Sequence, residues 1–139
     1  MGLAQGAVLS PLLFALYAAD LVVAVPHPIQ VLLFADDIVL FASGLDGVES
    51  SDAVNFAMGS VSIWLDDNGL SLSADKTVVV HFTRCRRIPA TSRIFYADVE
   101  LPLRPFTRFL GMILDTQLRW TQHIRSLLEW GEKALNILR

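Results

Sequence analysis

Residues 31–41 read Val31-Leu32-Leu33-Phe34-Ala35-Asp36-Asp37-Ile38-Val39-Leu40-Phe41, an apolar run interrupted by two adjacent carboxylates. Burying an unpaired carboxylate is costly, and two neighbouring ones also repel each other. Such a pair is tolerated at a turn open to solvent, or where a cation neutralises it. The flanking runs have the composition of β-strands, so the stretch predicts a hairpin of residues 29–34 and 38–42 with Asp36 and Asp37 at its tip. A plain polar turn and a metal site are both open at this point.

A helix is predicted immediately before this hairpin. Ser10-Pro11 is a typical helix start, with Ser10 as the capping residue and Pro11 in the first turn. The helix should run to about Val25, because Pro26 and Pro28 stop it. Its apolar residues surround the helix on nearly all sides, which predicts a buried helix.

A second helix is predicted after the hairpin, over residues 48–67. Its apolar residues recur at spacings of three and four and form one stripe. They are Val54, Met58, Val61 and Leu65. Asn68-Gly69 is a typical helix stop.

Short strands and one more helix are expected in the remainder of the chain. We predict strands at residues 77–82, 93–97 and 109–114, a basic loop at 84–92, and an amphipathic helix over 121–139. Helices that alternate irregularly with hairpins indicate an α+β fold with an antiparallel sheet.

The chain is unusually apolar for its size of 139 residues, which is that of one domain. Hydrophobic residues make up 53%, and the mean hydropathy is +0.49. The longest apolar stretch, residues 12–25, contains Asp20 and is shorter than the ~20 residues of a membrane span. Residues 1–11 lack the basic segment of a signal peptide, so no membrane partner is expected. The excess apolar surface suggests a covering subunit or a further part of the same domain.

Charge is distributed unevenly along the chain. Residues 1–83 hold nine acids and one base, Lys76, whereas residues 84–139 hold ten bases and five acids. An acidic half suits cation binding and a basic half suits contact with phosphates, although ordinary complementarity within the molecule is also compatible. The single cysteine, Cys85, excludes an internal disulfide, and the histidines have no metal-ligand spacing.

Four segments, in order along the chain, resemble motifs of reverse transcriptases. They are Gly2-Leu3-Ala4-Gln5-Gly6-Ala7-Val8-Leu9-Ser10-Pro11, similar to G-x-x-Q-G-x-x-x-S-P; Phe34-Ala35-Asp36-Asp37, similar to Y/F-A-D-D; the lysine-bearing stretch of residues 69–77; and Phe109-Leu110-Gly111, similar to the primer-grip hairpin. The likeness is strongest to the polymerases of non-LTR retrotransposons.

The resemblance implies an RNA-directed DNA polymerase that transfers deoxynucleotides from their triphosphates to a DNA primer on an RNA template. In that family two Mg²⁺ ions assist the transfer, and Asp36 and Asp37 would be ligands here, with Asp36 the stronger candidate. Lys76 would approach the leaving phosphate as a charge partner or proton donor. A solvated lysine paired with Asp75 or Asp66 is the structural alternative.

The resemblance also assigns contacts with the nucleic acid. Gln5 and Gly6 would lie near the template and the incoming nucleotide, where a glycine permits close backbone approach. Phe109, Leu110 and Gly111 would hold the primer end. Arg104 and Arg108 would lie near backbone phosphates. The alternative for Gly6 and its neighbours is a flexible chain start. The alternative for Phe109, Leu110 and Gly111 is an ordinary core strand.

In fold terms, the resemblance implies a palm-like antiparallel sheet packed on two helices within residues 1–115, and the start of a thumb helix in residues 116–139. The family's third carboxylate and its fingers come from segments upstream of the Q-G motif. We therefore expect an upstream fingers and palm segment of the same polymerase, and no polymerisation by these 139 residues alone. The alternatives are a non-enzymatic remnant of a mobile element and an unrelated α+β module that binds nucleic acid.

Overall fold

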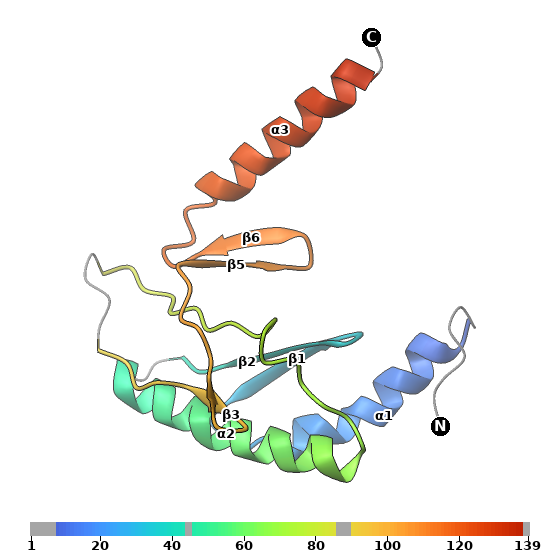
Figure 1. Cartoon of the computed structure of the whole chain (residues 1–139), viewed down its shortest axis with the longest axis vertical. Coiled ribbons are helices and arrows are strands. Elements are labelled where there is room, and N and C mark those ends of the chain that lie inside the picture. The colour runs from blue at the N-terminus through green and yellow to red at the C-terminus, as the bar shows by residue number, and fades with distance from the viewer. Residues whose placement is uncertain (1–7, 44–45, 86–89, 138–139) are drawn as a thin grey trace. The chain divides into compact units, whose positions relative to one another are not determined.

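The computed structural model describes residues 8–43, 46–85 and 90–137 (Figure 1). Within them it shows helices α1 (Ser10–Ala24), α2 (Gly47–Asp67) and α3 (Thr121–Ile137), and three antiparallel strand pairs. The strands are β1 (Gln30–Phe34), β2 (Asp37–Phe41), β3 (Phe95–Tyr96), β4 (Val99–Glu100), β5 (Phe106–Phe109) and β6 (Met112–Asp115). The predicted α+β class is confirmed. The chain divides into a first unit, residues 1–74 and 89–100, and a second unit, residues 75–88 and 101–139.

In the first unit, β1 and β2 form the predicted hairpin. Phe34 pairs with Asp37, so the loop consists of Ala35 and Asp36. Ala35 has a φ of 51°, in the left-handed region where a side chain costs roughly 1 kcal/mol or more. A loop of two residues with a positive φ at the first is typical of tight hairpins.

The core of the first unit lies between the two long helices and this hairpin. Leu21 of α1 and Val61 of α2 are fully buried, and Ala57 and Leu65 continue the buried stripe of α2. The predicted stripe of the second helix is therefore confirmed. Tyr17 links the helices further along, because its hydroxyl donates to the Asn68 carbonyl over 3.0 Å.

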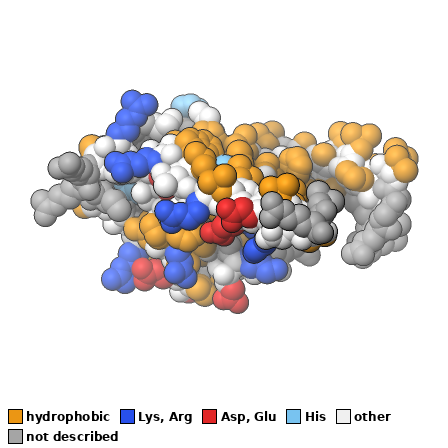
Figure 2. Space-filling model, turned by 90° about the horizontal axis from the view of Figure 1, so that it is seen from above, with side chains coloured by type: hydrophobic (Ala, Val, Ile, Leu, Met, Phe, Trp, Pro, Cys, Tyr) orange, Lys and Arg blue, Asp and Glu red, His pale blue; other side chains and the backbone are white. Residues whose placement is uncertain are grey.

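The prediction that the first helix is buried is wrong. In α1 only Ala18 and Leu21 are buried, because α2 and β1 cover one side of it. The large exposed apolar residues of α1 are Leu12, Leu13, Leu16, Tyr17, Val22 and Val23. Ser10 is not the cap either: Leu9 holds that position without a side-chain cap bond, and Ser10 already lies within the helix. Exposed hydrophobic side chains, drawn in orange, are common on the described surface in Figure 2.

Helix α2 begins and ends at local signals. The Asp46 carboxylate caps the start by accepting from the Glu49 N–H over 2.8 Å. At the other end, Gly69 has a φ of 64°, which confirms the predicted stop. Midway, the Asn55 amide binds the chain that leads into β3, donating to the Arg93 carbonyl over 2.6 Å and accepting from the Phe95 N–H over 3.0 Å.

In the second unit, β5 and β6 form a hairpin where the sequence suggested one strand over residues 109–114. Phe109 pairs with Met112, so Leu110 and Gly111 are the loop, with φ values of 48° and 82°. A turn with two successive positive φ values has a backbone twist that matches the right-handed twist of the two strands. Gly111 can adopt its positive φ without a steric penalty. The single-strand prediction was wrong, whereas the likeness to a short hairpin at Phe109-Leu110-Gly111 agrees with this turn.

The predicted strand over residues 77–82 is also not formed. Only Val79 makes a β-bridge, a parallel one to Leu103. The β-branched residues 77–80 favour an extended backbone. A continuous β-ladder, however, needs backbone N–H donors from both of the paired segments. Pro102 has no N–H to continue the pairing toward Thr77, which leaves a single bridge.

Helix α3 follows a short connection held by one side chain. The Asp115 carboxylate accepts hydrogen bonds from the backbone N–H groups of Gln117, Arg119 and Trp120, at 3.0 to 3.1 Å. These bonds lower the pKa of Asp115 below its ordinary value. The predicted helix over 121–139 is confirmed to Ile137, and its last two residues lie outside the described part of the chain. None of the helices in the described ranges is long and apolar enough to span a bilayer.

Candidate functional site

The two carboxylates singled out in the sequence lie together at the hairpin tip of the first unit. Asp36 is the second loop residue and Asp37 is the first residue of β2. Both are exposed. Alternate hairpin residues are half-buried and pack against the core, and they include Val31, Leu33, Ile38 and Leu40. The hairpin is therefore anchored by apolar packing while its tip presents two carboxylates to solvent.

The donor chemistry of this tip fits a hard divalent cation. Mg²⁺ prefers oxygen ligands and keeps several waters, so a few carboxylates suffice. In residues 8–43, 46–85 and 90–137, no cluster of three or more His, Cys, Asp or Glu side chains is arranged to hold a metal. Asp36 and Asp37 fit as a two-carboxylate contribution to such a site.

The electrostatic setting of the tip is strongly acidic. The first unit holds ten acids and one base, Arg93, for a net charge of −9. Arg93 is already paired with Glu100 at 3.1 Å. The second unit holds ten bases and four acids, for a net charge of +6. The difference in net charge between the two units is thus larger than that between residues 1–83 and residues 84–139. This distribution favours binding of cations by the first unit and of phosphates by the second.

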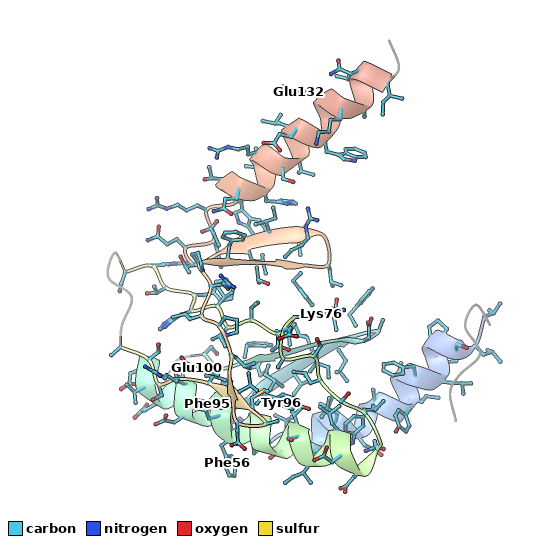
Figure 3. All side chains as sticks on the ribbon, viewed as in Figure 1. Phe56, Lys76, Phe95, Tyr96, Glu100 and Glu132 are labelled. Carbon is cyan, nitrogen blue, oxygen red and sulfur yellow. The ribbon has the colours of Figure 1, made fainter. Side chains whose placement is uncertain are left out.

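Lys76, labelled in Figure 3, lies exposed at a turn of residues 74–76. It belongs to the second unit, whereas Asp36 and Asp37 belong to the first. The alternative of an ion pair with Asp75 or Asp66 is not seen, since the ion pair found among the described residues joins Arg93 to Glu100. Gln5 and Gly6 lie outside the described residues.

The segment Phe109-Leu110-Gly111 forms the end of the β5–β6 hairpin. Phe109 is half-buried, whereas the Leu110 side chain in the loop is 45% exposed. Arg104 and Arg108, expected near phosphates, are both exposed in the same unit. The hairpin therefore has an apolar tip at Leu110. Its cationic side chains are Arg108 of β5 and Arg104, which precedes β5.

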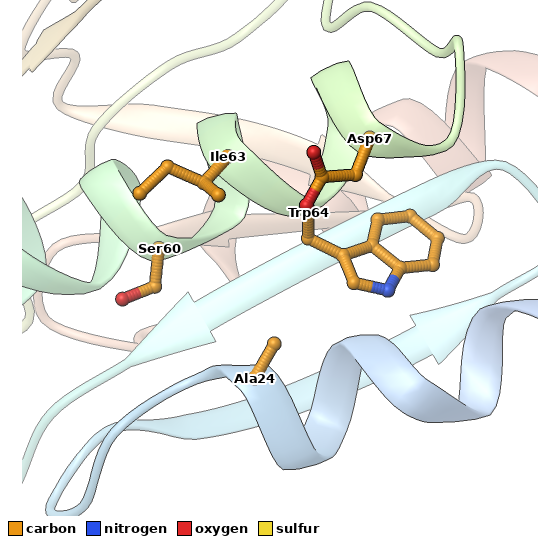
Figure 4. A pocket seen from close by; sticks show the side chains of 5 residues that line it. All are labelled: Ala24, Ser60, Ile63, Trp64 and Asp67. Carbon is orange, nitrogen blue, oxygen red and sulfur yellow. The ribbon is translucent and has the colours of Figure 1, made fainter.

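Among the hollows in the described surface are two that neither Asp36 nor Asp37 lines. One, of about 270 Å³, lies between α1 and α2 and is lined by Ala24, Ser60, Ile63, Trp64 and Asp67 (Figure 4). The other, of about 180 Å³, lies in the second unit and is lined by His81, Leu103, Arg104, Pro105 and Thr116. His81 and Thr116 were not singled out from the sequence, because only non-local backbone pairing brings them together.

Comparison with known proteins gives a consistent family assignment. A family model described as reverse transcriptase (RNA-dependent DNA polymerase) matches residues 1–126. The probable RNA-directed DNA polymerase from transposon X-element of Drosophila melanogaster is 26% identical over 133 residues, covering 91% of this chain and 14% of that protein. The corresponding polymerase from transposon BS of the same organism is 28% identical over 131 residues, covering 90% of this chain and 14% of that protein.

A third relative, the RNA-directed DNA polymerase from mobile element jockey of Drosophila funebris, is 27% identical over 136 residues and covers 91% of this chain. The chain spans about 14% of the length of each of these relatives. No solved structure matches. The family match includes the Q-G segment, the acid-bearing hairpin and the β5–β6 turn, and it confirms the resemblance read from the motifs. This chain belongs to the reverse transcriptase family, the RNA-dependent DNA polymerases.

Proposed function

We propose that this chain contributes part of the polymerising centre of an RNA-directed DNA polymerase of the non-LTR retrotransposon type. The observation that carries the proposal is the pair Asp36 and Asp37 at the tip of a core-anchored hairpin, in a chain of this family. The substrates would be an RNA template, a DNA primer and deoxynucleoside triphosphates. The curated relatives carry RNA-directed DNA polymerase in their names.

In this proposal residues 1–115 form part of the palm, and residues 116–139 begin the thumb. The β1–β2 hairpin packed against α1 and α2 supports the first assignment. The start of α3 at Thr121, directly after the connection held by Asp115, supports the second.

The residues of this chain would act mainly by positioning and charge. Asp36 and Asp37 would hold Mg²⁺, which when bound supplies charge stabilisation at the transferring phosphate. Lys76 would neutralise or protonate the leaving phosphate, and Gln5 and Gly6 would contact the template and the incoming nucleotide. Phe109, Leu110 and Gly111 would hold the primer end.

We also propose that the 139-residue chain does not polymerise by itself. The hairpin tip supplies two carboxylates, whereas the resemblance implies three, and a displacement of ~1 Å in such a centre can cost ~100-fold in rate. The missing carboxylate and the fingers would come from further segments of the same polymerase.

The net charge of +6 on the second unit favours a second candidate function, nucleic-acid binding without catalysis. The two functions differ in what the carboxylates do. A binding module would bind nucleic acid in a salt-sensitive manner and would be indifferent to Mg²⁺ and to Asp36→Asn.

The test is a titration of the ¹⁵N-labelled chain with Mn²⁺, which broadens amide signals near a bound ion. We expect broadening centred on residues 34–38, and a weakening of about tenfold or more in Asp36→Asn, because a metal ligand is lost. The matched control is Asp98→Asn, since Asp98 is the second loop residue of the β3–β4 hairpin. Broadening that is centred elsewhere, or equal in the two variants, would contradict the proposal.

A further inference from the structure

We propose that the hollow between α1 and α2 binds an arginine side chain presented by a basic polypeptide partner. The hollow has a volume of about 270 Å³ and belongs to the first unit. Neither Asp36 nor Asp37 lines it. Such an interaction goes beyond the proposed function, since it requires neither a metal ion nor nucleic acid.

One face of α2 builds most of the hollow. Its lining residues recur at spacings of three and four, so they share one side of the helix. They are Ser60, Ile63, Trp64 and Asp67, and Ala24 of α1 closes the opposite side (Figure 4). Ala24 and Ser60 are small. They leave a space between the two helices that the larger Ile63 and Trp64 bound.

Trp64 supplies an aromatic surface that is held in place. Its ring centroid lies 6.0 Å from that of Tyr17, and the two rings are inclined at 58°. Tyr17 is itself fixed, because its hydroxyl donates to the Asn68 carbonyl over 3.0 Å. Trp64 is only half-buried, so part of the indole is accessible to a ligand in the hollow. A cation placed over an indole is attracted by the negative face of the ring.

Two helix ends and a carboxylate make the hollow electrically negative. Ala24 is the last residue of α1 and Asp67 is the last residue of α2. The C-terminal end of a helix carries a partial negative charge, and neither helix has a basic residue in its last turn. Asp67 is exposed, and the ion pair found among the described residues does not involve it. An acid at this end opposes the helix dipole, so a bound cation would relieve an unfavourable arrangement.

The chemistry of the lining selects a guanidinium group among cations. Mg²⁺ requires several oxygen ligands, whereas Ala24 and Ile63 offer only apolar surface. A guanidinium is planar and weakly hydrated, stacks on aromatic rings and pairs with a carboxylate through two hydrogen bonds. Trp64 and Asp67 provide these two partners one helical turn apart. The volume equals that of about nine water molecules at ~30 Å³ each, which is room for a guanidinium and part of its methylene chain.

The surroundings of the hollow favour a polypeptide as the source of the guanidinium. The first unit has a net charge of −9, so it attracts a basic segment and repels a polyanion. The rim is apolar, since Ile63 is 65% exposed and Val23, next to Ala24 in the chain, is 86% exposed. A polypeptide would cover these side chains, whereas free arginine would meet only the hollow. A second copy of this chain is disfavoured, because each copy carries a net charge of −3.

The test is an NMR titration that follows the indole N–H signals of the ¹⁵N-labelled chain. The probe is a short blocked peptide with a central arginine flanked by lysines and leucines. We expect a saturable shift of the Trp64 signal, and Trp120 and Trp130 of the second unit should not respond. Replacing only the central arginine should weaken binding about threefold or more for lysine and about tenfold or more for neutral citrulline. Equal affinity of the citrulline peptide, or equal shifts of all the indoles, would overturn the proposal.

A pair of charge variants separates the hollow from the general acidity of the first unit. Asp67→Asn should weaken peptide binding about tenfold, because the carboxylate that pairs with the guanidinium is lost. The matched control is Asp66→Asn, which removes the same charge from the same turn at a residue that does not line the hollow. It should weaken binding about twofold at most. Both changes remove an acid from a helix C-terminus, so neither should unfold the chain. Equal losses would show general attraction only and would overturn the assignment.

A pair of size variants fills the hollow without changing any charge. Ala24→Leu should abolish the Trp64 shift at peptide concentrations that saturate the unaltered chain. The matched control is Ala19→Leu, at another exposed alanine of α1 that does not line the hollow, and it should leave binding unchanged. Undiminished binding by Ala24→Leu would contradict the site.

Two further measurements identify the source of the guanidinium. N-acetylarginine amide should bind more weakly than the peptide, and equal affinity would overturn the choice of a polypeptide. Analytical ultracentrifugation tests the second copy as the occupant. Dimerisation that Asp67→Asn abolishes would assign the hollow to another copy of this chain and would overturn the proposal of a separate partner.

Discussion

The β1–β2 and β5–β6 hairpins both close with a two-residue loop and are held in place in different ways. Each has a two-residue loop with positive φ at its first residue, Ala35 or Leu110. The first hairpin packs on a core that includes fully buried Leu21 and Val61. The second belongs to a unit in which β5, β6 and α3 contain no buried residue, and backbone hydrogen bonds to Asp115 and Thr116 connect its segments.

The difference shows that one chain can position two loops by two physical means. Burial of apolar side chains is not directional, so it anchors the acid-bearing hairpin through residues such as Val31 and Leu40 while Asp36 and Asp37 at its tip stay exposed. Hydrogen bonds are directional, so they define the path of the chain from β6 to α3 with little buried area. The first hairpin should therefore be sensitive to lost volume, and the second to lost acceptors or loop geometry.

The largest effect should come from removing core volume beneath the first hairpin. Leu21→Ala is expected to cost about 2–5 kcal/mol in the free energy of unfolding, since Leu21 is fully buried against the hairpin and α2. Urea denaturation followed by circular dichroism measures it. The control is Leu16→Ala on the same helix, 65% exposed, which should change stability by less than about 0.5 kcal/mol. Similar costs for the two variants would contradict a core at Leu21.

Loop geometry should give the next largest effect, in the second hairpin. Gly111 has a φ of 82°, so Gly111→Ala should cost about 1–2 kcal/mol although no heavy atom beyond the adjacent residues lies within 4 Å of an added methyl group. The control is Gly131→Ala within α3, also in open space, which should gain up to about 1 kcal/mol because alanine favours the helix. Thermal unfolding compares the two, and a gain in both would show that the turn is not strained.

A local, pH-dependent effect is expected at the end of β6. The pKa of Asp115 is lowered, first by the hydrogen bond from the Arg119 N–H. Its contribution is therefore present above the ordinary value of 3.8 and lost as pH falls below it through the folded value. Amide exchange at Arg119 and Trp120, measured by NMR against pH, should accelerate in that range. Asp115→Asn should remove the pH step, and a step that survives would point to another group.

The smallest effect should come from the ion pair of the first unit. Arg93 and Glu100 are 3.1 Å apart and well exposed, so Glu100→Gln should change stability by about 0–1 kcal/mol at low salt. The difference should disappear at high ionic strength, as measured by urea denaturation with and without added salt. A larger effect would mean that charge, and not only burial, supports the first unit.

The sequence predicted the α1–hairpin–α2 arrangement well because its boundaries are local. Pro26, Pro28 and Gly69 end helices through their own backbone constraints, and the carboxylate pair interrupts an apolar run. The family motifs identified Asp36 and Asp37 and the turn at Gly111, and their roles stay predictions. These features depend on neighbours in the chain.

The errors came from features that depend on distant residues. The run Thr77–Phe82 has strand propensity, yet its partner segment contains Pro102 and allows one bridge only. Asn55 and Asp115 bind backbone groups that the sequence alone does not place near them. Burial of α1 was overestimated because apolar composition does not say how many sides of a helix are covered.

The β1–β2 sheet has two open edges in the described part of the chain, since β1 pairs only with β2. The outward-facing N–H and C=O groups of both strands are therefore free to form a ladder with an added strand. Exposed Leu32 and Phe34 would lie beside such a strand and add apolar contact. An extended segment could join next to the carboxylate pair without any native hydrogen bond first being broken, which makes this sheet a template for completion and, at high concentration, for self-association.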